Sequence, residues 1–295
     1  MQQKSLGKQL WEIFSPILVH VGVTFAVETA VIMGYYMRSL PELITAMETE
    51  EAMMEYILEM SSRVMEHAVE ITAIASVVAL PILIWMKSRD TKKEKAAGIV
   101  QNQKAPLSKY VWIVGISISF AVGLNNLLTL SNLAEYSEAY QETAEALYAP
   151  TFWVQILCLG ILAPITEEYV FRGLIYRRIR QNMSAARAIF VSALLFGIYH
   201  GNSVQMIYGA LCGVLLAYLY EKYGSMKAPI LAHILMNIAA CILTDVDGFT
   251  WMFEKPTRMA VITIACAAIG STMFLFIRDM KPKPEEVETD VYMQA

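Results

Sequence analysis

Apolar residues gather along the chain in blocks long enough to cross a bilayer, and charged segments separate these blocks. Because about 20 apolar residues span the hydrocarbon core as a helix, each block predicts a transmembrane helix. The pattern predicts an all-α polytopic membrane protein with about eight transmembrane helices. They cover residues 13–37, 68–86, 110–132, 151–171, 188–200, 203–221, 228–243 and 259–277. The fifth block is short, so we expect it to end inside protein or a wet cavity rather than in lipid.

The charged segments between the blocks alternate in sign along the chain. Glu dominates the first and third loops, whereas Lys and Arg dominate the second, fourth and sixth loops, and Arg278, Lys281 and Lys283 closely follow the last block. Since cytoplasmic loops carry the excess of Lys and Arg, this alternation predicts that both termini are cytoplasmic. Two cytoplasmic termini require an even number of spans, and eight satisfies that requirement.

The blocks and loops divide the chain into three parts. Residues 1–150 hold three predicted transmembrane helices, acidic outer loops and a basic cytoplasmic loop. Residues 151–243 hold four blocks, and residues 244–295 hold the last helix and a cytoplasmic tail. In the first loop, apolar residues at a spacing of three to four predict an amphipathic helix on the outer surface. Gly209 and Gly213 form a G-x-x-x-G pattern, which predicts close helix packing.

Composition narrows the class of protein further. Hydrophobic residues make up 56% of the chain and charged residues 17%, whereas a typical soluble domain is roughly 25% charged. The formal net charge of -4 argues against a nucleic-acid partner. All four cysteines lie inside the apolar blocks, where they behave as small hydrophobic residues rather than as a disulfide framework.

The fourth block ends with ionisable residues, which cost about 2.5–3.5 kcal/mol each within a bilayer. Glu168 and Arg172 are four residues apart on one helix face, so we expect them to form an ion pair. Glu167 is rotated by about 100° from that face. It is therefore left without this partner and is predicted to act as a base. The alternative is that both acids sit at the membrane interface near Arg177 without a chemical role.

Two further blocks carry polar groups. Phe196 and His200 lie at the end of the fifth block, and His233 and Asn237 lie one turn apart on the seventh. A single membrane histidine is more often a packing residue than a catalyst. Three helices that each deliver polar groups instead indicate a shared site.

Other polar residues in the blocks are predicted to have structural roles. His20 and Glu28 are eight residues apart, roughly on one face of the first helix, which favours interior packing or a helix contact. Asn125, Asn126 and Gln205 are predicted to form hydrogen bonds between helices.

Three motifs follow one another on successive predicted helices: Glu-Glu-x-x-x-Arg from Glu167, Phe-x-x-x-His from Phe196, and His-x-x-x-Asn from His233. In this order they resemble the CPBP family of CAAX-prenyl proteases and bacteriocin-processing enzymes, also called the Abi family. The matching stretch runs from about Ala163 to Asn237. The resemblance implies an intramembrane endopeptidase with a catalytic core in residues 151–243 and a peptide or protein substrate at the lipid bilayer.

The resemblance also implies roles for individual residues. Glu167 is similar to the catalytic glutamate of the family, and His200 to the histidine that helps it activate water. His233 and Asn237 match the pair that binds the developing oxyanion or, in an alternative view, a metal. The family pattern adds an accompanying acid and two supporting residues, which are Glu168, Arg172 and Phe196.

The need for a metal is a separate question. A glutamate and two histidines suit Zn²⁺ with a fourth position open for water, so Glu167, His200 and His233 are candidate ligands. The His-Glu-x-x-His motif of common zinc proteases is absent from the sequence. We therefore favour a water activated by glutamate without an obligatory metal.

Two other functions are compatible with the same residues. One is a non-catalytic immunity or scaffold protein that keeps the fold. The other is a proton-coupled transporter in which Glu167 and His200 form a relay. The predicted topology and the lack of organelle signals favour a bacterial plasma membrane. Protein prenylation is not expected there, so we expect peptide maturation or self-immunity to bacteriocins.

Overall fold

The protein, in a computed structural model, is all-α. The structure describes residues 5–99, 103–133, 135 and 137–280, and no strand occurs among them. Its helices are α1 (Leu6–Arg38), α2 (Leu40–Ala46), α3 (Glu50–Glu66), α4 (Ala68–Ala96), the 3₁₀ turn η1 (Leu107–Tyr110), α5 (Val111–Leu130), α6 (Glu138–Tyr148), α10 (Ala185–Tyr199), α11 (Ser203–Tyr223), α12 (Lys227–Asp245), α13 (Gly248–Phe253) and α14 (Pro256–Arg278), together with one continuous helix over residues 152–180. The predicted cytoplasmic tail, residues 281–295, lies outside the described residues.

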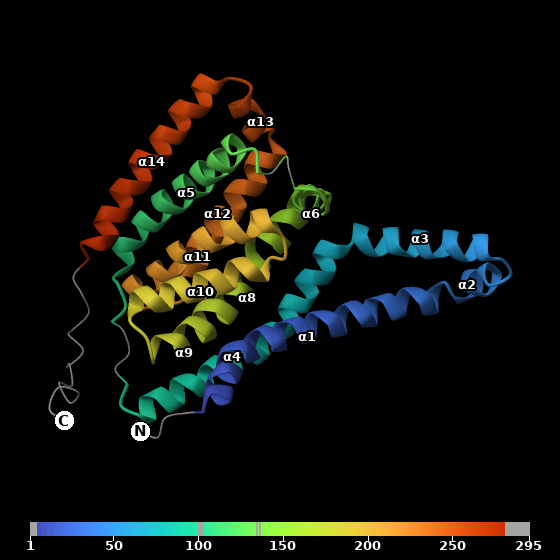
Figure 1. The fold of residues 1–295 in the computed structure, drawn as a ribbon, viewed down its shortest axis with the longest axis horizontal. Coiled ribbons are helices and arrows are strands. Elements are labelled where there is room, and N and C mark those ends of the chain that lie inside the picture. Colours follow the sequence, from blue (N-terminus) through green and yellow to red (C-terminus); the bar gives the residue numbers. More distant parts are fainter. Residues whose placement is uncertain (1–4, 100–102, 134, 136, 281–295) are drawn as a thin grey trace.

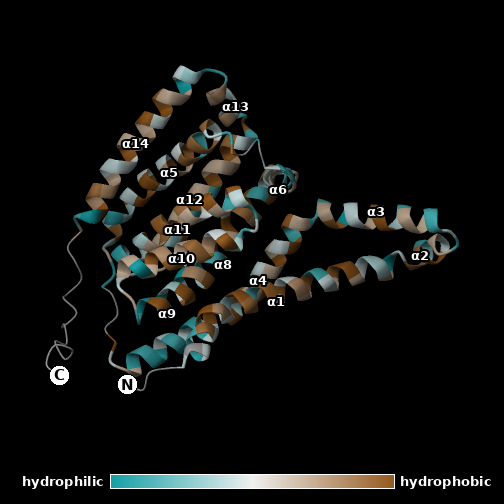
Figure 2. Ribbon diagram, in the orientation of Figure 1, coloured by the Kyte–Doolittle hydropathy of each residue, from teal (hydrophilic) through white to brown (hydrophobic). Residues whose placement is uncertain are grey.

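Seven helices among the described residues are long and apolar enough to cross a membrane. They correspond to seven of the predicted blocks, and Figure 2 shows hydrophobic residues along α1 and α14. The fifth block forms α10, which has 15 residues. At 1.5 Å per residue α10 is about 22 Å long, less than the roughly 30 Å of hydrocarbon. The fold is thus the predicted polytopic one, with seven long helices and one short helix in place of eight full spans.

The helix over residues 152–180 is not a uniform α-helix. It runs through α7 (Phe152–Gln155), the π-helical stretch η2 (Ile156–Leu162), α8 (Ala163–Glu168), the π-helical stretch η3 (Tyr169–Tyr176) and α9 (Arg177–Arg180). In a π-helix each N–H donates to the carbonyl five residues earlier, and such turns are frequent at functional sites. The two acids of the first motif therefore lie on a short α-helical section between two π-helical stretches.

This interrupted helix lies in the middle of the molecule. In Figure 1 it packs with α10, α11 and α12 between two outer pairs, α5 with α14 and α1 with α4. The main hydrophobic core is shared by these central helices, α4 and α5. The first motif is therefore surrounded by protein, not by lipid.

The helices α10 and α11 pack at close range through glycines. A Cβ atom on Gly213 would lie 2.8 Å from the Cα atom of Ala193, and a Cβ atom on Gly197 would lie 2.3 Å from the Met206 carbonyl oxygen. A Cβ atom on Gly209 would lie 3.2 Å from Nδ1 of His200. The close packing predicted from Gly209 and Gly213 is therefore confirmed, and it fixes α10, the helix that His200 directly follows.

Replacing Gly213 by Ala is expected to destabilise the protein. The added methyl group has to push the α10 backbone away, and such overpacking costs about 1–3 kcal/mol. Thermal unfolding in detergent measures the loss. Gly34→Ala on α1 is the matched control, because a Cβ atom there meets nothing within 4 Å. Equal melting temperatures for the Gly213→Ala and wild-type proteins would contradict the close contact.

The end of α1, with α2 and α3, forms an arm that projects from the rest of the protein (Figure 1). The arm has its own small core of Ala46, Tyr56 and Met60, and the Ser39 and Tyr56 hydroxyl groups are hydrogen-bonded at 2.6 Å. The helix α3 confirms the predicted helix in the first loop. Its position on the outer membrane surface stays a prediction.

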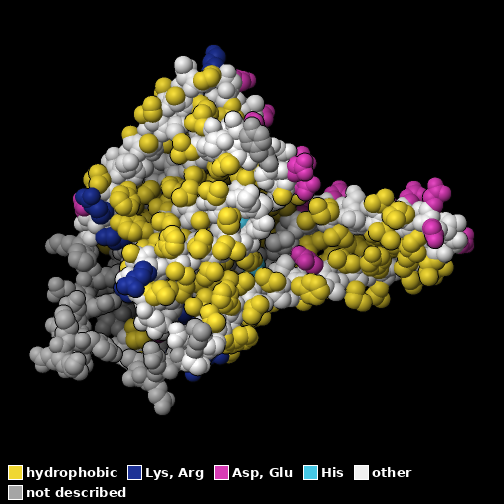
Figure 3. Space-filling view, in the orientation of Figure 1, with side chains coloured by type: hydrophobic (Ala, Val, Ile, Leu, Met, Phe, Trp, Pro, Cys, Tyr) yellow, Lys and Arg dark blue, Asp and Glu magenta, His cyan; other side chains and the backbone are white. Residues whose placement is uncertain are grey.

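Charged side chains on the visible face gather at opposite ends of the molecule. Figure 3 shows Lys and Arg mostly near the chain termini, and Asp and Glu at the far end and at the tip of the arm. At the basic end, Arg178 donates to Asp90 over 2.7 Å, and Arg177 pairs with Glu94. This separation agrees with the alternating loop charges, while cytoplasmic termini stay a prediction.

Candidate active site

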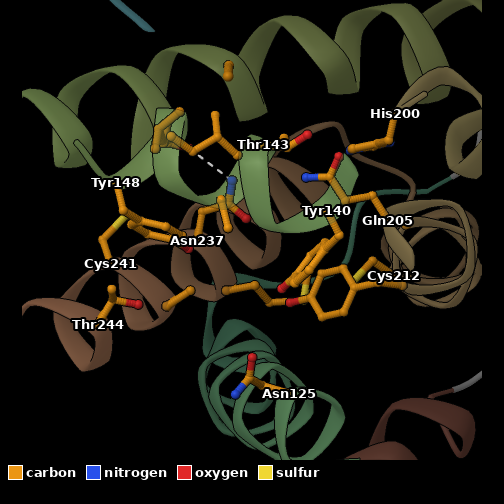
Figure 4. A pocket seen from close by; sticks show the side chains of 18 of the residues that line it. Asn125, Tyr140, Thr143, Tyr148, His200, Gln205, Cys212, Asn237, Cys241 and Thr244 are labelled. Atoms are coloured by element: carbon orange, nitrogen blue, oxygen red, sulfur yellow. Dashed lines mark hydrogen bonds between the residues drawn. The ribbon is translucent and has the colours of Figure 1, made fainter. Parts of the chain in front are cut away.

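A pocket of about 400 Å³ lies between the central helices and α6. In Figure 4, Tyr140, Tyr148, His200, Gln205 and Asn237 lie around it on different helices. From the three motifs, five residues line this pocket: Glu167, Phe196, His200, His233 and Asn237. The folded chain thus brings one or more residues of each motif to a single pocket.

The other two motif residues, Glu168 and Arg172, lie behind the pocket in the protein interior. Both side chains are 0% exposed, and Nη1 of Arg172 donates to Oε1 of Glu168 over 2.7 Å. The second amino group of Arg172 donates to the Gly213 carbonyl over 3.1 Å, and the guanidinium lies 4.5 Å from the centre of the Phe196 ring. The predicted ion pair is present, and it ties the first motif to α10 and α11.

His233 on α12 stands between the two acids of the first motif. Its Nδ1 atom is 2.9 Å from Oε1 of Glu168, and its Nε2 atom is 3.6 Å from Oε2 of Glu167. Glu168 as a carboxylate only accepts hydrogen bonds, so Nδ1 of His233 is the protonated nitrogen. The distance of 3.6 Å is too long for a direct hydrogen bond. The Glu167 carboxylate and Nε2 of His233 are therefore free to bind a common small ligand such as a water.

Glu167 and Glu168 differ in environment, as their positions on the helix predict. The Glu167 side chain is 19% exposed and faces the pocket, whereas Glu168 is fully buried between Arg172 and His233. Arg177, the cation of the alternative interpretation, instead pairs with Glu94 on α4. The two acids thus have different surroundings, one at the pocket and one in the interior.

His200 follows the last residue of α10 and is oriented by its own helix. Its Nδ1 atom is 2.8 Å from the Phe196 carbonyl oxygen, which can only accept, so Nδ1 carries the proton. Its Nε2 atom is then the basic nitrogen of the ring. The Phe196 ring lies edge-to-face with the rings of His200 and His233, at 4.8 and 5.8 Å. Phe196 thus separates and supports the two histidines.

Asn237 is held by a backbone carbonyl that has no hydrogen-bond donor within the interrupted helix. The Ala163 N–H donates five residues back, to the Cys158 carbonyl. The next carbonyl in this register belongs to Leu159 and would pair with residue 164, which is proline and has no N–H. Nδ2 of Asn237 donates to this Leu159 carbonyl over 2.9 Å. Pro164 thereby frees the acceptor that positions Asn237 at the pocket.

The three candidate zinc ligands do not come together as a metal site. Among the described residues no group of three or more His, Cys, Asp and Glu side chains is placed to hold a metal ion. Nδ1 of His200 faces a backbone carbonyl, and Nδ1 of His233 faces Glu168. These bonds leave Nε2 of both histidines free, as in histidines that bind metals through Nε2, so the need for a metal stays a prediction.

Part of the pocket wall comes from α6, which the sequence analysis did not single out. Tyr140, Thr143 and Tyr148 of this helix line the pocket. Burial raises the pKa of Tyr148 to about 12, so its hydroxyl group stays protonated at neutral pH. The signal was available, because Tyr140, Thr143, Ala144, Leu147 and Tyr148 recur at the spacing of one helix face.

The polar residues assigned to helix contacts divide into two groups. Nδ2 of Asn126 donates to the Thr263 hydroxyl of α14 over 3.0 Å, which confirms a hydrogen bond between helices. Asn125 and Gln205 instead line the pocket. Gln205 accepts from Asn202 over 2.8 Å, within one turn of α11. Among the described residues, Gln205 forms no hydrogen bond to another helix.

Residues 149–239 match the family model described as type II CAAX prenyl endopeptidase Rce1-like. A protein of Bacillus subtilis named membrane peptidase YdiL is 24% identical over 201 residues, which cover 67% of this chain and 81% of that protein. Human CAAX prenyl protease 2 is 27% identical over 155 residues, which cover 44% of this chain and 45% of that protein. No solved structure matches the chain.

The matched segment contains all three motifs and the helices α7 to α11 with most of α12. Seven long apolar helices make the chain a multi-pass membrane protein. Within this membrane protein, residues 149–239 are similar to the Rce1-like type II CAAX prenyl endopeptidases, and both relatives are named as membrane or prenyl proteases.

Proposed function

We propose that the protein is an endopeptidase that hydrolyses a peptide bond within the membrane by a water activated at Glu167. The observation that carries this proposal is the position of His233, 2.9 Å from the buried Glu168 and 3.6 Å from Glu167 at the pocket. A histidine fixed by one acid and facing a second is the arrangement that general acid–base chemistry requires.

In this proposal the bound water donates hydrogen bonds to two acceptors. It donates one hydrogen to Oε2 of Glu167 and the other to Nε2 of His233, which leaves an oxygen lone pair for the substrate. As the water oxygen bonds to the peptide carbonyl carbon, Glu167 takes the proton. The carbon–nitrogen bond then breaks, and Glu167 returns that proton to the leaving amine.

Glu168 and Asn237 assist without taking part in the bond changes. Glu168 accepts from Nδ1 of His233 and so keeps Nε2 unprotonated and directed at the water, much as the acid of a Ser-His-Asp triad orients its histidine. Asn237 donates one amide hydrogen to Leu159, and its second amide hydrogen is available to the oxyanion. His200 presents a basic Nε2 that assists in the binding of water.

The expected substrate is a peptide or protein at the membrane, in peptide maturation or self-immunity to bacteriocins. The test is incubation of the purified protein in liposomes with unprenylated precursor peptides and with a prenylated Cys-a-a-X peptide, read by mass spectrometry. We expect cleavage of an unprenylated peptide. Binding of every peptide without cleavage would instead favour a scaffold. Proton uptake that persists in Glu167→Gln, with no peptide cut, would favour a transporter.

Addition of a strong metal chelator is expected to leave the cleavage rate unchanged, because the proposed steps use only Glu167, His233 and a water. The comparison is between untreated, chelator-treated and zinc-supplemented protein with the same peptide. Loss of cleavage with chelator and its return with zinc would contradict the metal-free mechanism. It would leave the endopeptidase assignment in place.

A further inference from the structure

The first helix packs against the core through the partly buried Ile13, Ile17, Val19 and Val23, but two of its three fully buried side chains are polar. The most apolar 18-residue window of α1 is only 6% buried. Among the α1 side chains that the structure describes, those that are buried are Ser15, Pro16 and His20. Ser15 accepts from Nη1 of Arg178 over 3.1 Å at the basic end of the molecule. His20 therefore makes the second polar attachment of this helix, one and a half turns further along.

His20 is bonded through one nitrogen and leaves the other unpaired. Its Nδ1 atom is 2.6 Å from the Tyr199 hydroxyl oxygen, and the residue is 6% exposed. The Nε2 atom is buried and has no hydrogen-bond partner among the described atoms. An unpaired buried polar atom costs about 1–3 kcal/mol, so an apolar side chain would pack here at lower cost. Packing alone does not explain a histidine at this position.

The surroundings connect His20 to the pocket acid. Tyr199 directly precedes His200, and its ring lies 6.1 Å from that of His200 and 5.4 Å from that of Phe171. The Glu167 carboxylate interacts electrostatically with both His20 and Tyr199. His20 and Tyr199 thus lie within electrostatic range of the same acid that His233 approaches from α12.

We propose that His20 and Tyr199 form a hydrogen-bonded positioning pair for Glu167, in which Nε2 of His20 reaches the Glu167 carboxylate through one bridging water. The pair acts through Glu167 and touches no substrate, so this inference rests on the proposed function. It also gives α1, which lies outside the family segment, a part in the site. Glu167 is then positioned by histidines of two helices, His20 of α1 and His233 of α12.

Substitutions at His20 distinguish the role of its Nδ1 atom from the role of its Nε2 atom. His20→Gln can keep a polar atom near the Nε2 position, whereas His20→Asn can keep the bond to Tyr199 but not the Nε2 group. We expect His20→Phe and His20→Asn to lower kcat by about 10–100-fold with little change in KM, as loss of a supporting contact does elsewhere. We expect His20→Gln to recover most of this loss. Ser15→Ala is the matched control, because it removes the other polar attachment of α1.

A double-mutant cycle measures the contact without any substrate. We expect the melting-temperature changes of His20→Phe and Glu167→Gln to be non-additive when combined, and those of Ser15→Ala and Glu167→Gln to add. Additive changes in both cycles would overturn the positioning pair. So would equal losses of kcat in Ser15→Ala and His20→Phe, or His20→Gln as inactive as His20→Phe.

The two proposals fail in different ways. A wild-type protein that cleaves no peptide defeats the proposed function, and the thermal cycle still decides whether His20 contacts Glu167. A wild-type protein that cleaves, an inactive Glu167→Gln protein and a fully active His20→Phe protein together defeat only the positioning pair.

Discussion

Glu167→Gln is expected to lower the rate of peptide cleavage by about 10²–10⁴-fold, the usual contribution of a general base. Glutamine has nearly the size of glutamate and can still accept a hydrogen bond from water, but it cannot take the proton. We therefore expect peptide binding and thermal stability to change little. Single-turnover cleavage followed by mass spectrometry measures the loss, and peptide binding to the variant is measured in parallel.

Glu59→Gln is a suitable control for the charge change. Glu59 lies on α3 in an exposed pair with Arg63, outside the pocket lining. It is expected to cleave at the wild-type rate. A Glu167→Gln protein that keeps the wild-type rate would remove Glu167 as the base, and the buried position of Glu168 would leave the pocket without a carboxylate of the first motif to replace it.

Arg172→Met is expected to destabilise the protein by about 3–5 kcal/mol, as the loss of one partner of a buried ion pair does. The substitution leaves the Glu168 carboxylate at 0% exposure without its cation. It also removes the donor to the Gly213 carbonyl. The effect is measured by unfolding the protein in detergent at increasing denaturant concentration. We expect the folded fraction of Arg172→Met to fall at a lower denaturant concentration than that of the wild-type protein.

The double variant Glu168→Gln with Arg172→Met tests the cause of this loss. Because it removes the unpaired charge as well, we expect it to recover part of the stability that Arg172→Met loses. Arg63→Met is the surface control, since its pair with Glu59 is about half exposed on both sides. A double variant less stable than Arg172→Met would mean that the Glu168 carboxylate stabilises the fold through its bond to His233 even without the Arg172 cation.

The positions of the long helices could be predicted because a bilayer imposes a length and a composition on each span. The helical turns that continue beyond an apolar block could not be predicted in this way, because they lie in water or on other protein. The second block was predicted to end at residue 86, but α4 continues to Ala96, where Asp90 and Glu94 pair with the arginines of α9. The hydropathy of a segment indicates whether it contacts lipid, but it does not show where a helix ends once the chain has left the membrane.

Within the site, the sequence predicted contacts inside one helix better than contacts between helices. The pair of Glu168 and Arg172 follows from helical spacing alone. The position of His233 between both acids depends on the packing of α12 against α8, which spacing does not supply. His20 was predicted to take part in interior packing or a helix contact, and it does contact Tyr199 of α10. The partner could not be predicted, because α1 and α10 are far apart in the sequence.

The two π-helical stretches affect how this helix is aligned with those of other proteins. A π turn holds about one residue more than an α turn, and one residue corresponds to about 100° of rotation. A relative whose equivalent helix is α-helical throughout should therefore lack single residues within 156–162 and 169–176. A gap-free alignment of such a pair would bring non-equivalent side chains into correspondence on the two sides of the acids, although the acids themselves are equivalent.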